Sequence, residues 1–231
     1  MLANLEEQKK VRDSYEECSV KRSHILHGLE SIIINSNTSL EGNTFYSHLT
    51  FEILPDLVYK QLNLFWCGKQ ATTKICEIGF NAGHSCMLML LGREKTPLDM
   101  TIFDIGHHAY TKPCLDYIQS AFPHTRLEYV EGDSTVTMPS WVNNHQDEQE
   151  TFDVVHVDGG HSHFCITNDM MNTDQLVKVG GIIIVDDTDI SYISNELDTY
   201  IQSGRYEEIK IFPMSQCQFQ HRIARKLKHA L

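Results

Sequence analysis

Three aspartates in this sequence follow two short apolar runs, and their type and spacing could bind a metal ion. Asp158 closes the run 152–158, and Asp186 and Asp187 close the run that begins at Gly181. If these runs are neighbouring parallel strands, the carboxylates meet at one sheet edge and repel one another unless a cation lies among them. Oxygen ligands favour a hard divalent ion, with Mg²⁺ first and Mn²⁺ or Ca²⁺ as alternatives. Aspartates that only cap helices are the competing explanation, but an adjacent pair exceeds what capping requires.

A histidine three residues beyond Asp158 could act as a general base. His161 lies on the loop that leaves this run. Its imidazole has an unperturbed pKa of about 6.5, which suits removal of a proton from a metal-held hydroxyl at neutral pH. His156 and His163 are alternatives for the role. By strand alternation His156 points to the same face as Asp158, either as a core histidine or as part of a pocket wall.

A glycine turn follows another apolar run, 74–78, and indicates a bound nucleoside. Gly79 and Gly83 are spaced G-x-x-x-G. The glycine that lets a pyrophosphate approach the backbone in G-x-G-x-x-G is missing. The turn therefore favours a cofactor without phosphates, S-adenosylmethionine (SAM), over a dinucleotide; a glycine turn with no ligand is the alternative. The cofactor-binding residues predicted here are Glu77, Gly79, Asn81, Gly83, His84 and Ser85.

Two further acidic residues follow the next two runs. Asp104 lies 25 residues after Gly79, which is about where a carboxylate accepts hydrogen bonds from ribose hydroxyls. Asp133, or an amide beside it at Ser134, could hold the adenine amino group. Asp133 could equally be a simple helix N-cap.

The elements that must position these residues alternate along the chain. Strands are expected at 73–78, 100–104, 126–130, 152–158, 181–186, 206–212 and 216–224, and helices at 3–33, 50–66, 83–92, 113–121, 134–142, 164–178 and 192–203. This rhythm predicts an α/β fold, a Rossmann-like, mostly parallel seven-stranded sheet with helices on both faces. The last two runs are joined too closely for a helical crossover, so they should form an antiparallel hairpin at one edge.

Residues 1–70 are expected to form an N-terminal helical cap or lid over the carboxyl ends of the strands, and residues 71–231 the catalytic domain. The segment of mixed charge at 3–33 and the polar break 35–39 support this division. Such a cap would supply contacts to the acceptor.

Composition limits the class of partner. The net charge of −12 opposes binding to nucleic acid and to anionic membranes. No apolar run approaches the ~18 residues that a membrane span needs. Seven scattered cysteines without a C-x-x-C pair suit a reducing compartment, so a cytoplasmic location is expected. The oligomeric state is left open, a homodimer included.

Together, these motifs resemble the class I SAM-dependent methyltransferases. Residues 77–85 look like the first motif of the family-24 type, and 157–161 with 184–187 is similar to the metal site of cation-dependent O-methyltransferases. The Asp-x-x-His spacing of Asp158 and His161 is most similar to a sugar-modifying branch in which the histidine is the base. Catechol-type enzymes use a lysine near the first metal carboxylate, whereas here the next lysine after Asp158 is Lys178.

The resemblance implies transfer of a methyl group from SAM to a hydroxyl held on a divalent metal. A cation with open positions binds two neighbouring oxygens well, so the vicinal diol of a sugar in a small molecule or glycan is the preferred acceptor, and a catechol is the alternative. Two hypotheses come from other classes. One is a zinc metallohydrolase that uses the residues from His156 to His163. The other is a partner subunit that binds SAM without catalysis.

Overall fold

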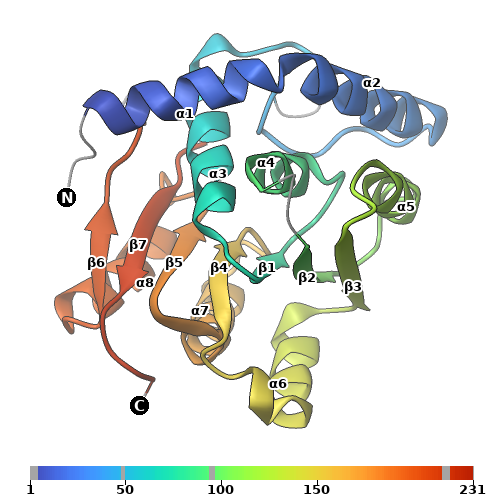
Figure 1. Cartoon of the computed structure of the whole chain (residues 1–231). Helices are drawn as coiled ribbons and strands as arrows, with labels where there is room; N and C mark the ends of the chain where they lie inside the picture. Colours follow the sequence, from blue (N-terminus) through green and yellow to red (C-terminus); the bar gives the residue numbers. More distant parts are fainter. Residues whose placement is uncertain (1–4, 48–49, 94–96, 215–218, 231) are drawn as a thin grey trace.

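Seven strands form a single sheet in the computed structural model, which describes residues 5–47, 50–93, 97–214 and 219–230 (Figure 1). The strands are β1 (Lys74–Ile78), β2 (Leu98–Asp104), β3 (Thr125–Glu131), β4 (Phe152–Val157), β5 (Val177–Val185), β6 (Tyr206–Ile209) and β7 (Arg222–Lys226). Their order across the sheet is β3-β2-β1-β4-β5-β7-β6. The first five pair in parallel, and β7 is antiparallel to both β5 and β6. The predicted fold class and edge hairpin are confirmed.

Helices cover both faces of this sheet (Figure 1). One layer contains α3 (Val58–Gln70), α4 (His84–Gly92) and α5 (Thr111–Ala121), and the other contains α6 (Ser134–Asn144), α7 (His163–Leu176) and α8 (Ser191–Gln202). Two short 3-10 helices, η1 (Pro55–Leu57) and η2 (Gln146–Glu148), precede α3 and β4. Among the described residues, no helix is both long enough and apolar enough to cross a membrane.

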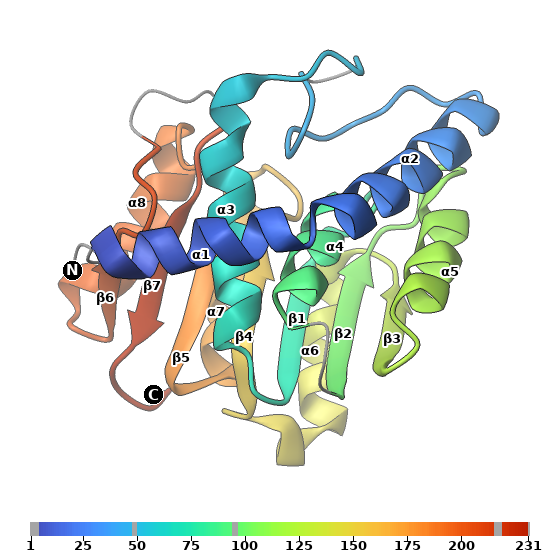
Figure 2. The same cartoon turned by 45° about the horizontal axis from the view of Figure 1, so that its top comes forward.

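The N-terminal segment differs in detail from the expected helix 3–33. It forms α1 (Leu5–Glu17) and α2 (Ser19–Asn35), separated at Cys18, while residues 3 and 4 lie outside the described ranges. α1 packs across the outer side of α3, and α2 packs across α4 and α5 (Figure 2). They share one hydrophobic cluster with that layer and the sheet. The part of residues 1–70 that reaches the carboxyl ends of the strands is the connection between α2 and α3, through Glu41, Gly42 and Asn43.

Several other boundaries shift. The strand expected at 206–212 ends at Ile209, and β5 begins at Val177, within the helix expected at 164–178. The helix expected at 50–66 begins only at Val58, because Pro55 heads a 3-10 turn instead of the α-helix. The last strand begins at Arg222, and residues 216–218 of the expected strand, with Cys217, lie outside the described residues. The other six cysteines, which lie among the described residues, carry free thiols.

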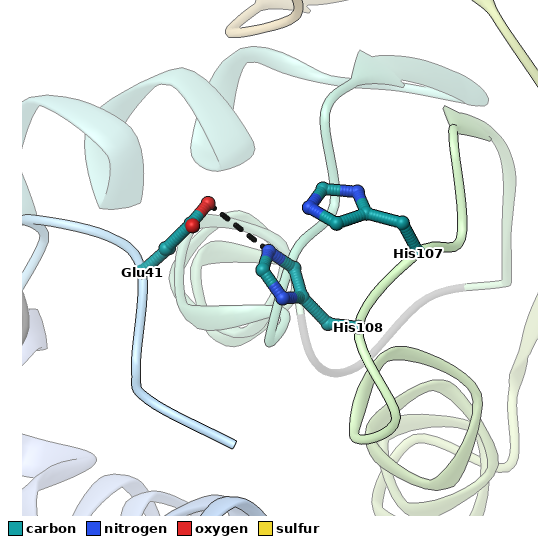
Figure 3. Close-up of side chains that lie close together, drawn as sticks. All are labelled: Glu41, His107 and His108. Atoms are coloured by element: carbon teal, nitrogen blue, oxygen red, sulfur yellow. Dashed lines mark hydrogen bonds and ion pairs between the residues drawn. The ribbon is translucent and has the colours of Figure 1, made fainter.

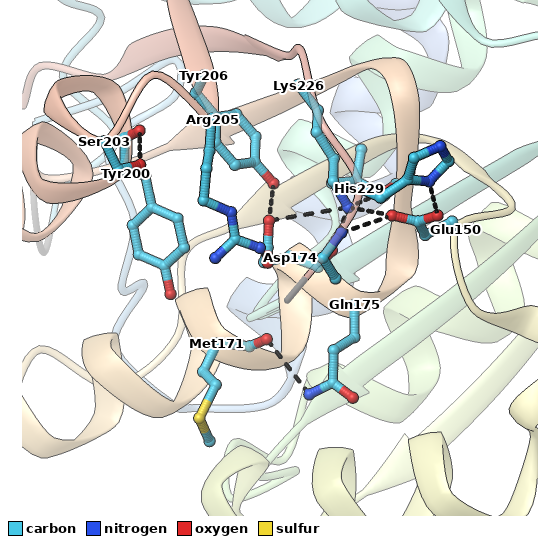
Figure 4. A network of polar contacts seen from close by, with 12 residues as sticks. Glu150, Met171, Asp174, Gln175, Tyr200, Ser203, Arg205, Tyr206, Lys226 and His229 are labelled. Carbon is cyan, nitrogen blue, oxygen red and sulfur yellow. Dashed lines mark hydrogen bonds and ion pairs between the residues drawn. The ribbon is translucent and has the colours of Figure 1, made fainter.

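The C-terminal hairpin is held to the sheet by a buried lysine. The Nζ atom of Lys226 donates hydrogen bonds to Glu150 Oε1 at 2.9 Å and to the carbonyl oxygen of Val177 at 3.0 Å (Figure 4). Asp174 of α7 accepts from the hydroxyl of Tyr206 in β6 at 2.9 Å. Because buried charges persist only when they are paired and hydrogen-bonded, these contacts hold β7 beside β5 and β6 beside β7.

Backbone hydrogen bonds fix the strand ends on which the predicted site depends. The amide of Asp158 donates to Ile78 at the end of β1 at 2.8 Å, and that of Asp186 donates to Val157 at the end of β4 at 2.9 Å. The expected juxtaposition of Asp158 with Asp186 and Asp187 therefore follows from the strand order β1-β4-β5.

Candidate active site

A cavity of about 390 Å³ opens at the carboxyl ends of the parallel strands. This is where open α/β sheets bind their ligands. The predicted site residues that line it are Gly79, Asn81, Asp104, Asp133, Ser134, Asp158, His161 and Asp187. The predicted residues Glu77, Gly83, His84, Ser85 and Asp186 do not form its wall.

The glycine turn is required by close packing around the cavity. Gly79 has a φ of 88°, and a Cβ atom there would lie 1.8 Å from the carbonyl oxygen of Asp158. Gly83, at φ 80°, is the N-cap of α4, and a Cβ atom would lie 2.6 Å from the ring of Phe80. Both positions lie in the left-handed region that only glycine adopts readily. Gly79 therefore lets the end of β1 lie against Asp158 and leaves bare backbone beside the cavity, whereas Gly83 lets α4 begin against Phe80.

Glu77 lies in the core beneath the turn. Its Oε1 atom accepts from the hydroxyl of Ser85 at 2.5 Å and lies 3.1 Å from Nδ1 of His156. Glu77 and His156 are fully buried. The structure thus brings these side chains together as a support for β1, β4 and α4, with no direct access to the cavity. His156 is a core histidine, one of the two alternatives that its strand position left open.

His84 is also buried. Its ring packs edge-on against Phe45 at 5.8 Å and Tyr46 at 5.7 Å between centroids. Burial lowers its pKa to about 4, so the imidazole is neutral near pH 7. It joins α4 to the connection that precedes α3.

Asp104 lines the cavity and also anchors the glycine turn. Its Oδ2 atom accepts from the amides of Phe80 and Asn81, both at 2.8 Å, and Oδ1 accepts from the amide of Gly106 at 2.7 Å. Oδ2 has used both of its lone pairs, whereas Oδ1 can accept one further hydrogen bond. The contact between Asp104 and the ribose therefore stays a prediction. The sequence did not indicate the structural role of Asp104, which is to anchor the glycine turn.

Asp133 is the N-cap of α6. Its Oδ1 atom accepts from the amide and hydroxyl of Thr135 at 2.9 and 2.7 Å. These hydrogen bonds, the hydroxyl first, lower the pKa of Asp133. The capping alternative is thus present in the structure, while Asp133 and Ser134 still line the cavity, as a contact to a bound adenine would require.

Asp158, His161 and Asp187 meet on the cavity wall. Each offers one ligand atom, and the three atoms lie within 4.8 Å of one another. His161 Nε2 is 2.7 Å from Asp187 Oδ2, and this hydrogen bond raises the pKa of His161. Burial, followed by repulsion from Asp186 and Asp187, raises the pKa of Asp158. The wall therefore combines a base candidate with two carboxylates that gain from a nearby cation.

The third carboxylate, Asp186, is paired inside the protein. Its Oδ2 atom lies 2.7 Å from Nζ of Lys60, and the exposed fractions of the two side chains are 2% and 0%. Burial alone would raise the pKa of Asp186, but Lys60 and the nearby histidines outweigh it and lower the pKa. Lys60 also donates to Oδ1 of Asn43, a residue of the cavity wall.

This pairing changes the predicted metal ligand set. Asp158 and Asp187 face the cavity, whereas Asp186 is already neutralised by Lys60. Three carboxylates against one ammonium leave a net negative charge that His161, when protonated, offsets only in part. Hard oxygen donors and residual negative charge fit a divalent ion such as Mg²⁺. Asp158 and Asp187 are therefore the residues that could contact such an ion from the cavity wall. Asp186 lies behind them and is paired with Lys60.

The residues of the zinc-hydrolase hypothesis do not form one group of ligands. His156 Nδ1 lies near Glu77, while His156 offers one ligand atom within 4.8 Å of those of Asp158 and Asp186; His161 instead forms a group with Asp158 and Asp187. His163 is the exposed first residue of α7, and among the described residues it belongs to no group able to hold a metal.

Lys60, Glu41 and Asn43 are the site residues that sequence reasoning missed. They come from residues 1–70, where no motif marks them. One signal was present for Lys60, which stands in a stretch of α3 that is buried from residue 60 to residue 68. A charged residue in such a stretch requires a buried partner.

Comparison with known proteins agrees with this arrangement. A family model described as a methyltransferase domain matches residues 76–188, from β1 to the residue after Asp187. The fold and this match are consistent with a class I SAM-dependent methyltransferase of the family-24 type, the resemblance that the motifs predicted. No curated protein sequence matches the chain significantly.

Solved structures share the whole architecture at low identity. An O-methyltransferase from Bacillus cereus in complex with SAH is 15% identical, with 90% of this chain and 91% of that chain covered and a TM-score of 0.60. The cofactor-bound protein Rv0187 from MTB is 14% identical, with 89% and 90% covered and a TM-score of 0.61. At these identities the likeness establishes the fold, which extends over residues on both sides of the matched region.

Proposed function

We propose that this protein is a metal-dependent O-methyltransferase that transfers the methyl group of SAM to a hydroxyl of a small molecule or glycan. The observation that carries the proposal is the His161–Asp187 pair, at 2.7 Å, in the wall of the same cavity that the glycine turn lines. The group that could accept the proton and the turn that would bind the methyl donor then face the same cavity. The SAH-bound O-methyltransferase from Bacillus cereus, which shares the fold, supports the same reaction type.

The donor side of the cavity is assigned to the β1 and β2 ends. Gly79 and Asn81 present backbone and an amide side chain, and Asp104 presents a carboxylate that can still accept a ribose hydroxyl. Asp133 and Ser134 lie where the adenine would be held. SAM supplies a methyl group on a sulfonium that departs as neutral SAH, so the protein has mainly to orient the two reactants.

His161 is assigned the role of general base. When its Nε2–H donates to Asp187, the lone pair of Nδ1 is left to accept a proton from the acceptor hydroxyl. Asp187 then fixes the ring orientation and stabilises the imidazolium that results, as a carboxylate does for a catalytic histidine elsewhere. The C–O bond forms as the S–CH₃ bond breaks, and the hydroxyl proton ends on His161.

Asp158 and Asp187 are assigned as the metal ligands, with Mg²⁺ as the first candidate and Mn²⁺ as the alternative. A bound divalent ion would lower the pKa of the acceptor hydroxyl and orient it. Two neighbouring oxygens suit such an ion, so we propose the vicinal diol of a sugar as acceptor.

The catechol alternative needs a lysine base, and Lys60 is the lysine that reaches the carboxylates. Although burial alone would lower its pKa, Asp186 and Asp158 together raise it. A charged, fully buried ammonium cannot remove a proton from an acceptor in the cavity. Lys60 is therefore assigned to hold Asp186 and Asn43, and His161 keeps the role of base.

Residues 1–70 are proposed to contribute to acceptor selection as the cap part of the protein, with residues 71–231 as the catalytic part. Glu41, Gly42 and Asn43 support this, because they line the cavity opposite the strand ends.

An acceptor screen tests the proposal. The wild-type protein is incubated with SAM, Mg²⁺ and a panel of sugar vicinal diols and catechols, and SAH release and product mass are measured. We expect turnover with a diol, lost in His161→Gln and kept in His163→Gln, the matched change of an exposed neighbour. Equal turnover in both variants would overturn the role of His161, and methylation of catechols alone would overturn the sugar acceptor.

A further inference from the structure

A second group of possible metal ligands lies at the rim of the cavity. Glu41 comes from the connection between α2 and α3, and His107 and His108 come from the loop between β2 and α5 (Figure 3). Each offers one ligand atom, and the three atoms lie within 4.8 Å of one another. All three residues line the cavity. They share no residue with Asp158, His161 and Asp187.

The side chains converge in a way that suits one ion. Glu41 Oε2 lies 3.0 Å from Nε2 of His108, and the two imidazole rings have centroids 3.8 Å apart (Figure 3). Ligand atoms bound tetrahedrally to Zn²⁺ at 2.0–2.1 Å lie roughly 3.3 Å from one another. The Glu41–His108 separation of 3.0 Å is close to that spacing, and the ligand atom of His107 lies within 4.8 Å of both.

Tyr110 holds two of the three groups in place. Its ring stacks on His108 with a centroid distance of 4.8 Å and an interplanar angle of 7°. Its hydroxyl accepts from the backbone amide of Glu41 at 3.3 Å and donates to Oδ1 of Asn81 at 2.8 Å. Fixed neighbours of this kind orient metal-binding side chains and increase affinity. The group is therefore supported by a buried residue and is not a chance meeting of surface side chains.

We propose that Glu41, His107 and His108 bind a borderline divalent transition-metal ion, Zn²⁺ in the first instance, at the rim of the cavity. Two imidazoles and one carboxylate are donors that prefer such an ion to Mg²⁺. Three protein ligands leave a fourth position for water or for an atom of a bound molecule. The ion would join the segment before α3 to the β2–α5 loop across the cavity mouth. This site does not depend on the proposed methyl transfer.

Calorimetric titration of the purified full chain with Zn²⁺ tests the site directly. We expect His108→Asn and Glu41→Gln each to weaken one binding event at least tenfold or to remove it. His124→Asn, a change at another exposed histidine, should leave that event within twofold of the wild type. Asp187→Asn should also leave it in place, because Asp187 belongs to the other ligand group.

Two readouts make the result decisive. Co²⁺ bound at a site with imidazole ligands gives visible absorption bands, which should be present in the wild type and lost in His108→Asn. Saturating Zn²⁺ should raise the thermal midpoint of the wild type more than that of His108→Asn, since a ligand that binds only the folded state stabilises it. If His108→Asn keeps the wild-type stoichiometry and affinity, or if Asp187→Asn alone loses zinc, the Glu41–His108 pair is only a hydrogen bond and the proposal is wrong.

Discussion

Nζ of Lys60 lies 2.7 Å from Oδ2 of Asp186, and both side chains are withdrawn from solvent. An ammonium from α3 thus stands behind the carboxylates at the ends of β4 and β5. It neutralises the carboxylate that does not face the cavity and leaves Asp158 and Asp187 to act there. This relationship connects the N-terminal part of the chain to the catalytic wall.

Removal of the Lys60 charge should destabilise the fold. Lys60→Met leaves Asp186 buried without its partner, which typically costs about 3–5 kcal/mol. The double variant Lys60→Met/Asp186→Asn should regain part of that loss, because the carboxylate nearest Lys60 is then neutral although Asp158 and Asp187 still lie nearby. Denaturant unfolding measures both, with Lys112→Met as an exposed control expected to stay within about 0.5 kcal/mol. Additive effects in the double variant would show that the pair is not coupled.

Gly79 should tolerate no side chain. Gly79→Ala forces a Cβ atom toward the carbonyl oxygen of Asp158 and also strains a φ of 88°. Gly180→Ala is a matched control, because its φ is 84° but no atom lies within 4 Å of the added carbon. We expect the control to lose about 1–2 kcal/mol of unfolding free energy from backbone strain alone, and Gly79→Ala to lose at least twice that amount. Equal losses of unfolding free energy would contradict the close approach of β1 and β4.

His84 should make stability depend on pH between about 6.5 and 4. Burial lowers its folded-state pKa to about 4, below the unfolded value of 6.5. The unfolded chain therefore binds the proton first, so stability is full above pH 6.5 and falls as the pH drops toward 4. The loss approaches about 3 kcal/mol.

His84→Phe keeps the ring contacts with Phe45 and Tyr46 and removes the proton site. Unfolding free energies at pH 7, 6, 5 and 4 should decline less in this variant than in the wild type. The exposed His27→Asn variant should keep the wild-type slope. Parallel profiles for His84→Phe and the wild type would exclude His84 as a source of the dependence.

Metal removal should separate binding of SAM from methyl transfer. With an acceptor from the screen, chelation should lower turnover at least ~100-fold, about 2.7 kcal/mol of transition-state stabilisation, and Mg²⁺ should restore it. Asp187→Asn should lose the same activity, while Asp189→Asn, its exposed neighbour, should keep it. Affinity for SAM should change less than threefold throughout. Full turnover in excess chelator would contradict the metal proposal.

The parallel part of the sheet could be predicted because β1, β2, β4 and β5 contain apolar runs that are bounded by glycine or acidic residues. The alternation of strands and helices along the sequence predicted that β1 ends at the glycine turn. Together with the right-handed crossover rule, it also predicted that β4 and β5 are neighbours. The helix break at Cys18 could not be predicted, because no proline or glycine marks it.

The site was predictable where its residues lie in the loops that follow the strands. Asp158, His161 and Asp187 lie on the cavity wall as expected. Glu77 was misplaced, because alternation along β1 turns its side chain toward Ser85 and His156. Lys60 lies 98 residues from Asp158 in the sequence and reaches it only through tertiary packing, which no local pattern encodes.

The most direct test of the account is the rate of SAH formation by His161→Gln at saturating SAM and acceptor. Loss of a general base typically lowers turnover by 10²–10⁴-fold. We predict a loss in that range, with the dissociation constant of SAM within threefold of the wild-type value. Wild-type turnover in His161→Gln would contradict the assignment of the His161–Asp187 pair as the group that accepts the hydroxyl proton.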